Sequence, residues 1–126
     1  MLVLDSGGVS RLAERSPQAA ALILELRERG LWPPTVPSVV LVECLQGHAG
    51  RDAMTNRFLQ TCEIVEDIRE ALARRAALLR RQARRGSAVD VLVVALAEPD
   101  GTVLTSDLGD LAALARYSHQ VRVERV

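Results

Sequence analysis

The chain has 126 residues, the length of one ordinary domain, and 48% of them are hydrophobic, which is enough for a buried core. Its 16 arginines balance its 16 acidic residues, so the formal net charge of zero indicates no general attraction to nucleic acid, and lysine is absent. The longest apolar stretch, residues 91–97, is far shorter than the roughly 20 residues of a membrane span, and the N-terminus lacks the basic start of a signal peptide. We therefore expect a single cytoplasmic domain.

Short apolar segments alternate with longer helical patterns along the chain. In order, the sequence predicts a strand at 1–4, a helix at 17–29, a strand at 35–36, helices at 38–47 and 51–60, a strand at 62–65, helices at 67–85 and 87–97, a strand at 102–105, a helix at 107–116 and a strand at 121–123. Pro17 suits the first turn of its helix, Gly30 suits the position beyond its end, and Ser38 is expected to cap the next helix. Short buried strands separated by helices indicate an α/β fold with a parallel sheet covered on both faces. Ligands of such sheets bind beyond the carboxyl ends of the strands.

Five acidic residues stand at positions where the surrounding sequence is apolar. Asp5 and Asp107 follow predicted buried strands, and Asp110 lies one helical turn after Asp107. Glu43 is the only charged residue in 39–45, and Asp90 is the only one in 87–97. Carboxylates at the carboxyl edge of a parallel sheet are candidates for a shared site.

Four of these acids also have a structural explanation. Asp5 and Asp107 suit the N-cap position of a following helix, and Asp90 stands three residues after Ser87, as in a capping box. Asp110 suits the first turn of a helix, where the helix dipole favours negative charge. For each of them taken singly, the structural and functional hypotheses both remain open.

Glu43 has no such explanation. It is predicted in the middle of a helix, among residues that look buried, with no arginine within one turn. An ionised carboxylate in that environment costs several kcal/mol unless a charge compensates it. A divalent cation shared with other carboxylates would do so, and oxygen ligands suit Mg²⁺ or Mn²⁺.

The acids occur in a characteristic order with their neighbours. The motifs are a strand followed by Asp5, Pro37-x5-Glu43, Asp90 followed by the apolar run to Ala97, and Thr105-Ser106-Asp107-x-x-Asp110-Leu111. This order resembles the PIN-domain family, and most of all the toxin ribonucleases of VapBC-type toxin–antitoxin pairs, over essentially the whole chain. The resemblance implies one PIN-like domain over residues 1–126, in which a central parallel five-stranded sheet is flanked by helices in three layers.

The resemblance also implies an activity and its residues. Asp5, Glu43, Asp90 and Asp107 match the family's acidic positions and would bind one or two Mg²⁺ or Mn²⁺ ions, with Asp110 as an accessory catalytic acid. The implied activity is endonucleolytic hydrolysis of RNA, and the implied partners are a second copy of the chain and a small cognate antitoxin. The chain departs from the family in two places: Gly7 replaces a hydroxyl or amide residue, with Ser6 beside it, and Leu111 replaces a frequent aromatic residue.

Arginines, histidines and cysteines are further candidates for roles in binding or catalysis. Arg11 and Arg15 are candidates for holding the RNA backbone, since guanidinium groups match phosphate geometry, whereas Arg74, Arg81 and Arg85 are predicted to form a solvated helix face. The histidines and cysteines show no metal-ligand spacing, so we expect His48 and His119 at the surface and Cys44 and Cys62 as free thiols. Receiver domains and haloacid-dehalogenase-type phosphatases place acids similarly but usually employ a lysine, which this chain lacks. The remaining alternative is a catalytically silent PIN-like binding module.

Overall fold

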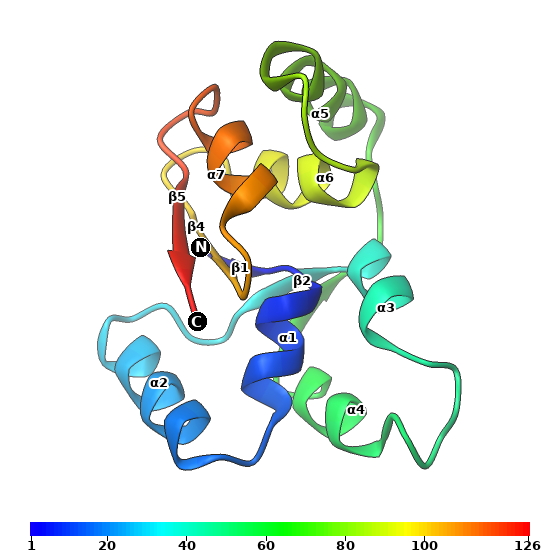
Figure 1. The fold of residues 1–126 in the computed structure, drawn as a ribbon, viewed down its shortest axis with the longest axis vertical. Coiled ribbons are helices and arrows are strands. Elements are labelled where there is room, and N and C mark those ends of the chain that lie inside the picture. The colour runs from blue at the N-terminus through cyan, green and yellow to red at the C-terminus, as the bar shows by residue number, and fades with distance from the viewer.

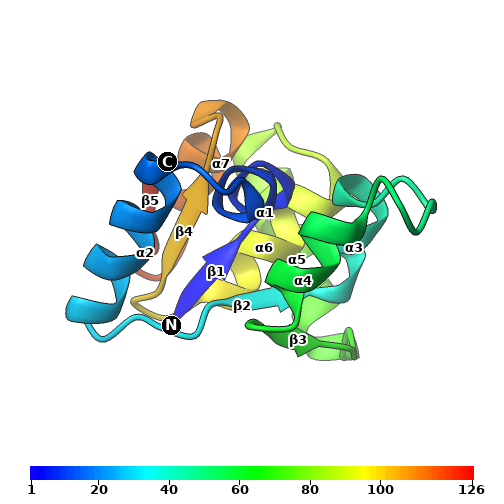
Figure 2. The ribbon, with the colours of Figure 1, turned by 90° about the horizontal axis from the view of Figure 1, so that it is seen from below.

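The sheet at the centre of the protein has five strands, all parallel, in the order β3-β2-β1-β4-β5. The computed structural model describes all 126 residues. The strands are β1 (Leu2–Leu4), β2 (Thr35–Pro37), β3 (Glu63–Val65), β4 (Thr102–Thr105) and β5 (Arg122–Arg125). Figure 2 shows the sheet with β3 and β5 at its opposite edges. The prediction of a parallel five-stranded α/β sheet is therefore confirmed.

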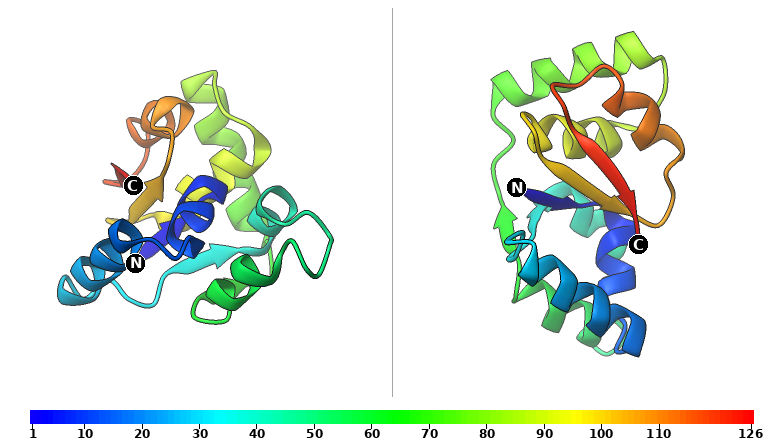
Figure 3. Two further views of the ribbon diagram at one scale, coloured as in Figure 1. Left: turned by 60° about the horizontal axis from the view of Figure 1, so that its bottom comes forward. Right: turned by 90° about the vertical axis from the view of Figure 1, so that its left-hand side faces the viewer.

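Seven helices cover the two faces of this sheet. They are α1 (Ser6–Ala13), α2 (Pro17–Glu28), α3 (Ser38–Cys44), α4 (Ala53–Leu59), α5 (Glu70–Ala83), α6 (Ala88–Ala97) and α7 (Gly109–Ala115). Helices α1–α4 lie on one side and α5–α7 on the other, which gives three layers (Figures 1 and 3).

The order of the strands explains this division of the helices. The chain first builds outward from β1 through β2 to β3, and then returns to the other side of β1 for β4 and β5. Because parallel crossovers are right-handed, reversing the direction of travel moves the connecting helices to the opposite face. The reversal falls between β1 and β4, and ligands of open α/β sheets bind at such a switch point, beyond the carboxyl ends of the strands.

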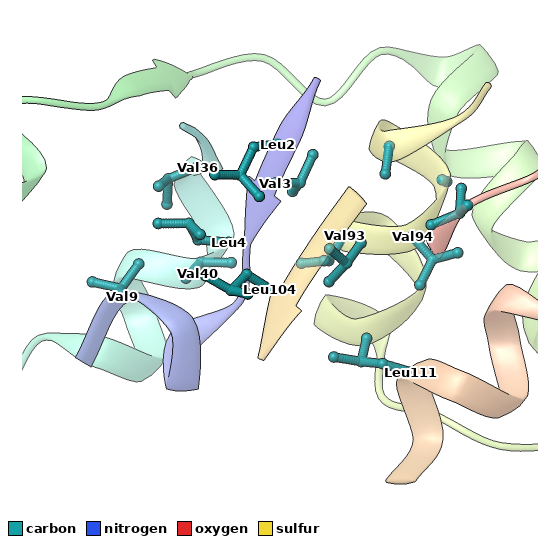
Figure 4. Packing of buried hydrophobic residues seen from close by; sticks show 14 of the residues in the cluster. Leu2, Val3, Leu4, Val9, Val36, Val40, Val93, Val94, Leu104 and Leu111 are labelled. Atoms are coloured by element: carbon teal, nitrogen blue, oxygen red, sulfur yellow. The ribbon is translucent and has the colours of Figure 1, made fainter. Parts of the chain in front are cut away.

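The core has two halves, one on each face of the sheet. Successive side chains of a strand point to opposite faces, and Figure 4 shows Leu2 and Leu4 on the side of Val9 and Val40, with Val3 on the opposite side of the strand. All of these side chains are almost completely buried. The core is aliphatic apart from Phe58, in keeping with an aromatic content of only 2%.

Helix α2 has the predicted ends, whereas helix α5 does not. Helix α2 begins at Pro17 behind a Ser16 cap, and Gly30 follows its end with a φ of 73°, as predicted. Helix α5 is shorter than the predicted 67–85: it begins at Glu70, and Arg84 ends it by adopting a left-handed conformation, φ 55°. Its outer face carries arginines, and its inner face buries Ala76 and Leu79.

Helix α3 differs from prediction at both ends. Its cap position is Pro37, while the Ser38 hydroxyl donates to the carbonyl of Glu66 at 3.2 Å. It ends at Cys44 rather than at residue 47, because the buried carboxylate of Asp52 accepts the backbone N–H groups of residues 46–48 at 2.9–3.1 Å and holds them in a turn. Those hydrogen bonds compete with continuation of the helix.

The sequence does not predict helix α1, because Gly7 and Gly8 indicate a turn rather than a helix. It forms because Asp5 caps it and Val9 and Leu12 are buried against the sheet. A β-carbon at Gly8 would collide with the carbonyl oxygen of Leu104 in β4. The glycine therefore allows the start of α1 to lie directly against the sheet, beside the ends of β1 and β4.

Both cysteines are free, as predicted, and both are half-buried. Burial raises the pKa of the Cys44 thiol, and it raises that of Cys62 to about 11. A thiol is a nucleophile only as its thiolate, so neither residue is suited to that chemistry near neutral pH. None of the helices combines the length and the apolar character that crossing a membrane requires.

Candidate active site

Four of the five predicted acids lie around one hollow at the switch point of the sheet. Leu4 of β1 pairs with Leu104 of β4, so the acids that follow these strands lie at the same edge. The hollow has a volume of about 230 Å³. Its lining residues are Asp5, Asp90, Asp107 and Asp110, together with Arg85, Gly109 and Leu111.

Asp5 is held by hydrogen bonds to both of its oxygens. The backbone N–H of Gly8 donates to Oδ1 at 2.7 Å, which makes Asp5 the N-cap of α1, and the Thr105 hydroxyl donates to Oδ2 at 2.5 Å. Burial raises the pKa of Asp5 above its ordinary value; these hydrogen bonds oppose the change and the charge of Asp90 adds to it. A desolvated carboxyl beside a second acid favours a proton or a bound cation.

Asp90 serves two purposes. Its Oδ2 accepts the backbone N–H of Ser87 at 3.0 Å while the Ser87 hydroxyl oxygen accepts the backbone N–H of Asp90 at 3.1 Å, a complete capping box at the start of α6. The predicted structural role is thus confirmed. Its Oδ1 accepts no hydrogen bond from the protein, and the residue also lines the hollow. The structural and functional hypotheses for Asp90 are therefore compatible.

Asp107 and Asp110 both line the hollow but differ in their partners. Asp107 is not the cap of α7, which begins at Gly109; its Oδ1 instead accepts the N–H of Gly109 at 3.2 Å, within the turn that follows β4. No cation pairs with it. Asp110, in the first turn of α7 as predicted, accepts a hydrogen bond from Nε of Arg85 at 2.9 Å. That ion pair was not predicted from the sequence.

Thr105 is the residue that sequence reasoning missed. Its side chain is fully buried, and besides donating to Asp5 it accepts the backbone N–H of Asp107 at 3.1 Å. It thereby links the acids that follow β1 and β4. A hydroxyl at the carboxyl end of a buried strand is the feature that indicates such a role, because a buried hydroxyl needs a hydrogen-bond partner.

The departure from the family pattern at Gly7 has a structural reason. A β-carbon at position 7 would collide with the hydroxyl of Ser106. The space that a side chain at position 7 would fill is therefore occupied by a serine from the turn after β4. A hydroxyl is still present at this point, contributed by Ser106 in the turn after β4.

Glu43 is not where the sequence analysis expected it. Its side chain is exposed rather than buried, it does not line the hollow, and its neighbour Val42 is 82% exposed. Helix α3 is short and completely buries only Val40, so an apolar run in the sequence does not mean that every face of this helix is covered. The burial argument for Glu43 as a ligand is therefore wrong, and only the family resemblance still supports that role.

The arginines are also distributed differently from prediction. Arg11 is exposed and pairs with Glu14 at 3.2 Å, and Arg15 borders a different hollow, between α1, α2 and α4. Arg74 and Arg81 are solvated, as predicted, but Arg85 reaches the acidic hollow. The cation nearest the acids is thus one that the sequence assigned to a helix face.

The donor set suits a hydrated hard cation. Carboxylate oxygens are the ligands of Mg²⁺ and Mn²⁺. No three acidic, histidine or cysteine side chains converge closely enough to hold a single ion directly. Mg²⁺ usually keeps several of its waters and binds through one or two carboxylates, so a hollow lined by four carboxylates fits such an ion without closer convergence.

Comparisons with known proteins bear on the fold. No protein-family model matches the sequence, and no curated protein matches it either. Among solved structures, the chain is similar to a chain in the crystal structure of VapBC2 from Rickettsia felis bound to a DNA fragment from their promoter. The TM-score is 0.70 at 14% identity, covering 100% of this chain and 99% of that chain. The protein therefore has a PIN-like fold over its whole length, shared with a chain of a VapBC complex.

Proposed function

We propose that the protein is a Mg²⁺- or Mn²⁺-dependent endoribonuclease, a hydrolase of RNA phosphodiesters, and the toxin of a toxin–antitoxin pair. The observation that carries this proposal is the hollow lined by Asp5, Asp90, Asp107 and Asp110 at the switch point between β1 and β4. The fold shared with a chain of a VapBC complex supports the toxin assignment. The proposed site of action is the cytoplasm.

Three of the acids that line the hollow have a proposed role that agrees with their contacts. Asp5, Asp90 and Asp107 would ligate the cation, since each has no basic partner, and Glu43 is a further proposed ligand on the family resemblance alone. A bound cation supplies Lewis acidity, which makes water a nucleophile near neutral pH and offsets charge on the phosphate. Thr105 and the start of α1 hold Asp5 rigidly for this purpose.

Cleavage of single-stranded RNA in Mg²⁺, in Mn²⁺ and in EDTA tests the proposed activity. We expect wild-type protein to cleave in either metal and not in EDTA, and Asp5→Asn to lose cleavage by orders of magnitude. Asp100→Asn is the matched control, because Asp100 is an exposed acid at the opposite end of β4, with a φ of 62° that asparagine also adopts. Equal cleavage by wild type and Asp5→Asn would overturn the assignment of the site.

A catalytically silent binding module is the alternative function. Such a module would keep the acids and the fold but would not cleave RNA. Wild-type protein that binds RNA in Mn²⁺ but cleaves neither total cellular RNA nor a library of random sequence would establish the alternative. A library is needed because a sequence-selective nuclease leaves a single substrate intact.

The proposed partners are a second copy of the chain and a small antitoxin. Since an active ribonuclease harms its host, we expect co-expression with the antitoxin to raise the yield of soluble protein severalfold. The antitoxin should co-purify with the chain and suppress its cleavage of RNA. A high yield of active wild-type protein without any partner in an ordinary host would contradict the toxin assignment.

A further inference from the structure

Arg85 is held at the rim of the acidic hollow by a tightly defined turn. Helix α5 ends at Arg84 in the left-handed conformation, and Gly86 follows with a φ of 95°. A β-carbon at Gly86 would lie 2.7 Å from Cδ1 of Leu114, so the turn is packed against α7. The capping box of α6 begins directly afterwards, at Ser87. The backbone on both sides of Arg85 is therefore constrained.

The guanidinium of Arg85 has unused hydrogen-bonding capacity. It donates to Asp110 through Nε alone, and its side chain is 57% exposed. In the two other ion pairs between residues far apart in sequence, Arg29 with Glu124 and Arg75 with Glu98, two nitrogens bind the two carboxylate oxygens. Since arginine carries five N–H donors, four of those of Arg85, all on its Nη atoms, have no partner in the protein.

The charge around the hollow creates a need for such a group. Four aspartates line it, and Arg85 is the only cation that does. An RNA strand must bring its phosphates close to those carboxylates, which repel it. A guanidinium whose two Nη atoms are free matches the geometry of two phosphate oxygens.

We propose that Arg85 binds an RNA phosphate at the acidic hollow through its two Nη atoms, while Asp110 holds the guanidinium in place through Nε. This inference rests on the proposed function. It makes Arg85 a substrate-binding residue and Asp110 a positioning residue that acts through the arginine. An exposed ion pair with only a structural role would contribute little to stability, and it would have no influence on RNA binding.

Two measurements on Arg85→Gln test the proposal: steady-state cleavage of RNA in Mn²⁺, and binding of a fluorescein-labelled single-stranded RNA in EDTA across a range of salt. We expect kcat/KM to fall about tenfold or more, mainly through KM, as for loss of a charge-assisted hydrogen bond. The slope of log K against log salt should become shallower by about 0.7, as for one phosphate contact to a single strand. Arg81→Gln, the same charge change on α5 away from the acids, should match wild type in both measurements.

Two further variants separate binding from a structural role. Arg85→Lys should bind RNA more tightly and have a higher kcat/KM than Arg85→Gln, but should not reach wild type. Lysine keeps the positive charge but lacks the planar pair of Nη donors. Asp110→Asn should raise KM less than Arg85→Gln does, because the guanidinium stays and only its orientation suffers. If Asp110→Asn and Arg85→Gln both match wild type in KM and in RNA binding, the ion pair is only structural and the proposal is overturned.

The outcomes also distinguish this inference from the proposed function. If wild type cleaves RNA and Arg85→Gln cleaves and binds it equally well, the inference on Arg85 fails and the ribonuclease assignment stands. If wild type cleaves no RNA but Arg85→Gln alone weakens binding and its salt dependence, the ribonuclease assignment fails and the phosphate contact stands.

Discussion

Replacing Asp90 by asparagine separates its capping role from its role in the hollow, because asparagine keeps an oxygen for the Ser87 N–H and removes the charge. Loss of a negative charge from the first turn of α6 costs about 0.3–1 kcal/mol. The same change removes the repulsion between Asp90 and Asp5, a partly buried carboxyl whose pKa is raised by burial and further by the charge of Asp90. Because these effects oppose each other, we expect Asp90→Asn in EDTA at pH 7 to be as stable as wild type or more stable.

Added Mn²⁺ should reverse this order. Binding to the native state alone stabilises wild type by about 2.7 kcal/mol at a hundredfold excess over Kd, which is about 10 °C in Tm at about 4 °C per kcal/mol for a domain of this size. Mn²⁺ should raise the stability of Asp90→Asn only a little, because one carboxylate of the cluster has lost its charge. Denaturant midpoints and Tm values for both proteins, with and without Mn²⁺, provide the measurement.

Ser87→Ala is the control, because it removes the other half of the capping box without altering an acid. Its free energy of unfolding should be lower than that of wild type by about 1 kcal/mol in both buffers, as for the loss of an N-cap. Mn²⁺ should stabilise it as much as it stabilises wild type. If Asp90→Asn instead behaves as Ser87→Ala does, destabilised equally in both buffers and still active, Asp90 is only a cap and the reasoning about a shared site fails.

Substitutions of Glu43, Glu98 and Gly8 test three further features of the structure. Glu43→Gln should leave Tm in EDTA unchanged, because Glu43 is exposed. It should reduce the increase in Tm caused by Mn²⁺, but less than Asp90→Asn does. If Mn²⁺ raises the Tm of Glu43→Gln as much as that of wild type, Glu43 is not a ligand. The side chain of Glu98 is only 7% exposed, and burial alone would raise its pKa. The hydrogen bonds and charge of Arg75, together with the hydrogen bond from the backbone N–H of His119 and the charge of His119, outweigh burial and hold the pKa below the ordinary value of 4.5. Glu98→Gln should therefore lower the free energy of unfolding by about 2 kcal/mol in denaturant titrations at pH 7. The difference from wild type should vanish as the pH falls through the lowered pKa of Glu98, because wild-type Glu98 is then neutral too. A difference in stability that is independent of pH would contradict this. Gly8→Ala should strongly destabilise the protein by the collision with Leu104, measured as a lower denaturant midpoint, and a midpoint equal to wild type would show that α1 can move away.

Much of the fold and part of the site could be predicted from the sequence, because the relevant features are local. A buried parallel strand is a short apolar run, and a helix end depends on residues within about one turn, as Ser16 and Gly30 of α2 and the capping box of Ser87 and Asp90 illustrate. The same local order places Asp5 and Asp107 after their strands. That these two strands are neighbours, so that the acids meet at one edge of the sheet, is decided by the strand order.

The tertiary structure alone decided the features that depend on contacts between distant segments. Helix α1 exists despite two glycines because Val9 and Leu12 are buried against the sheet, which Gly8 lets the helix approach. The Thr105 hydroxyl donates a hydrogen bond to Asp5 across 100 residues of sequence. Glu43 is exposed because α3 packs by one face only, and hydrophobic pattern cannot tell how many faces of a short helix are covered. Arg85 leaves the helix face predicted for it because the left-handed turn at Arg84 redirects the chain toward Asp110, 25 residues away. Periodicity and capping act over a few residues, whereas burial and ion pairing depend on which segments the fold brings together.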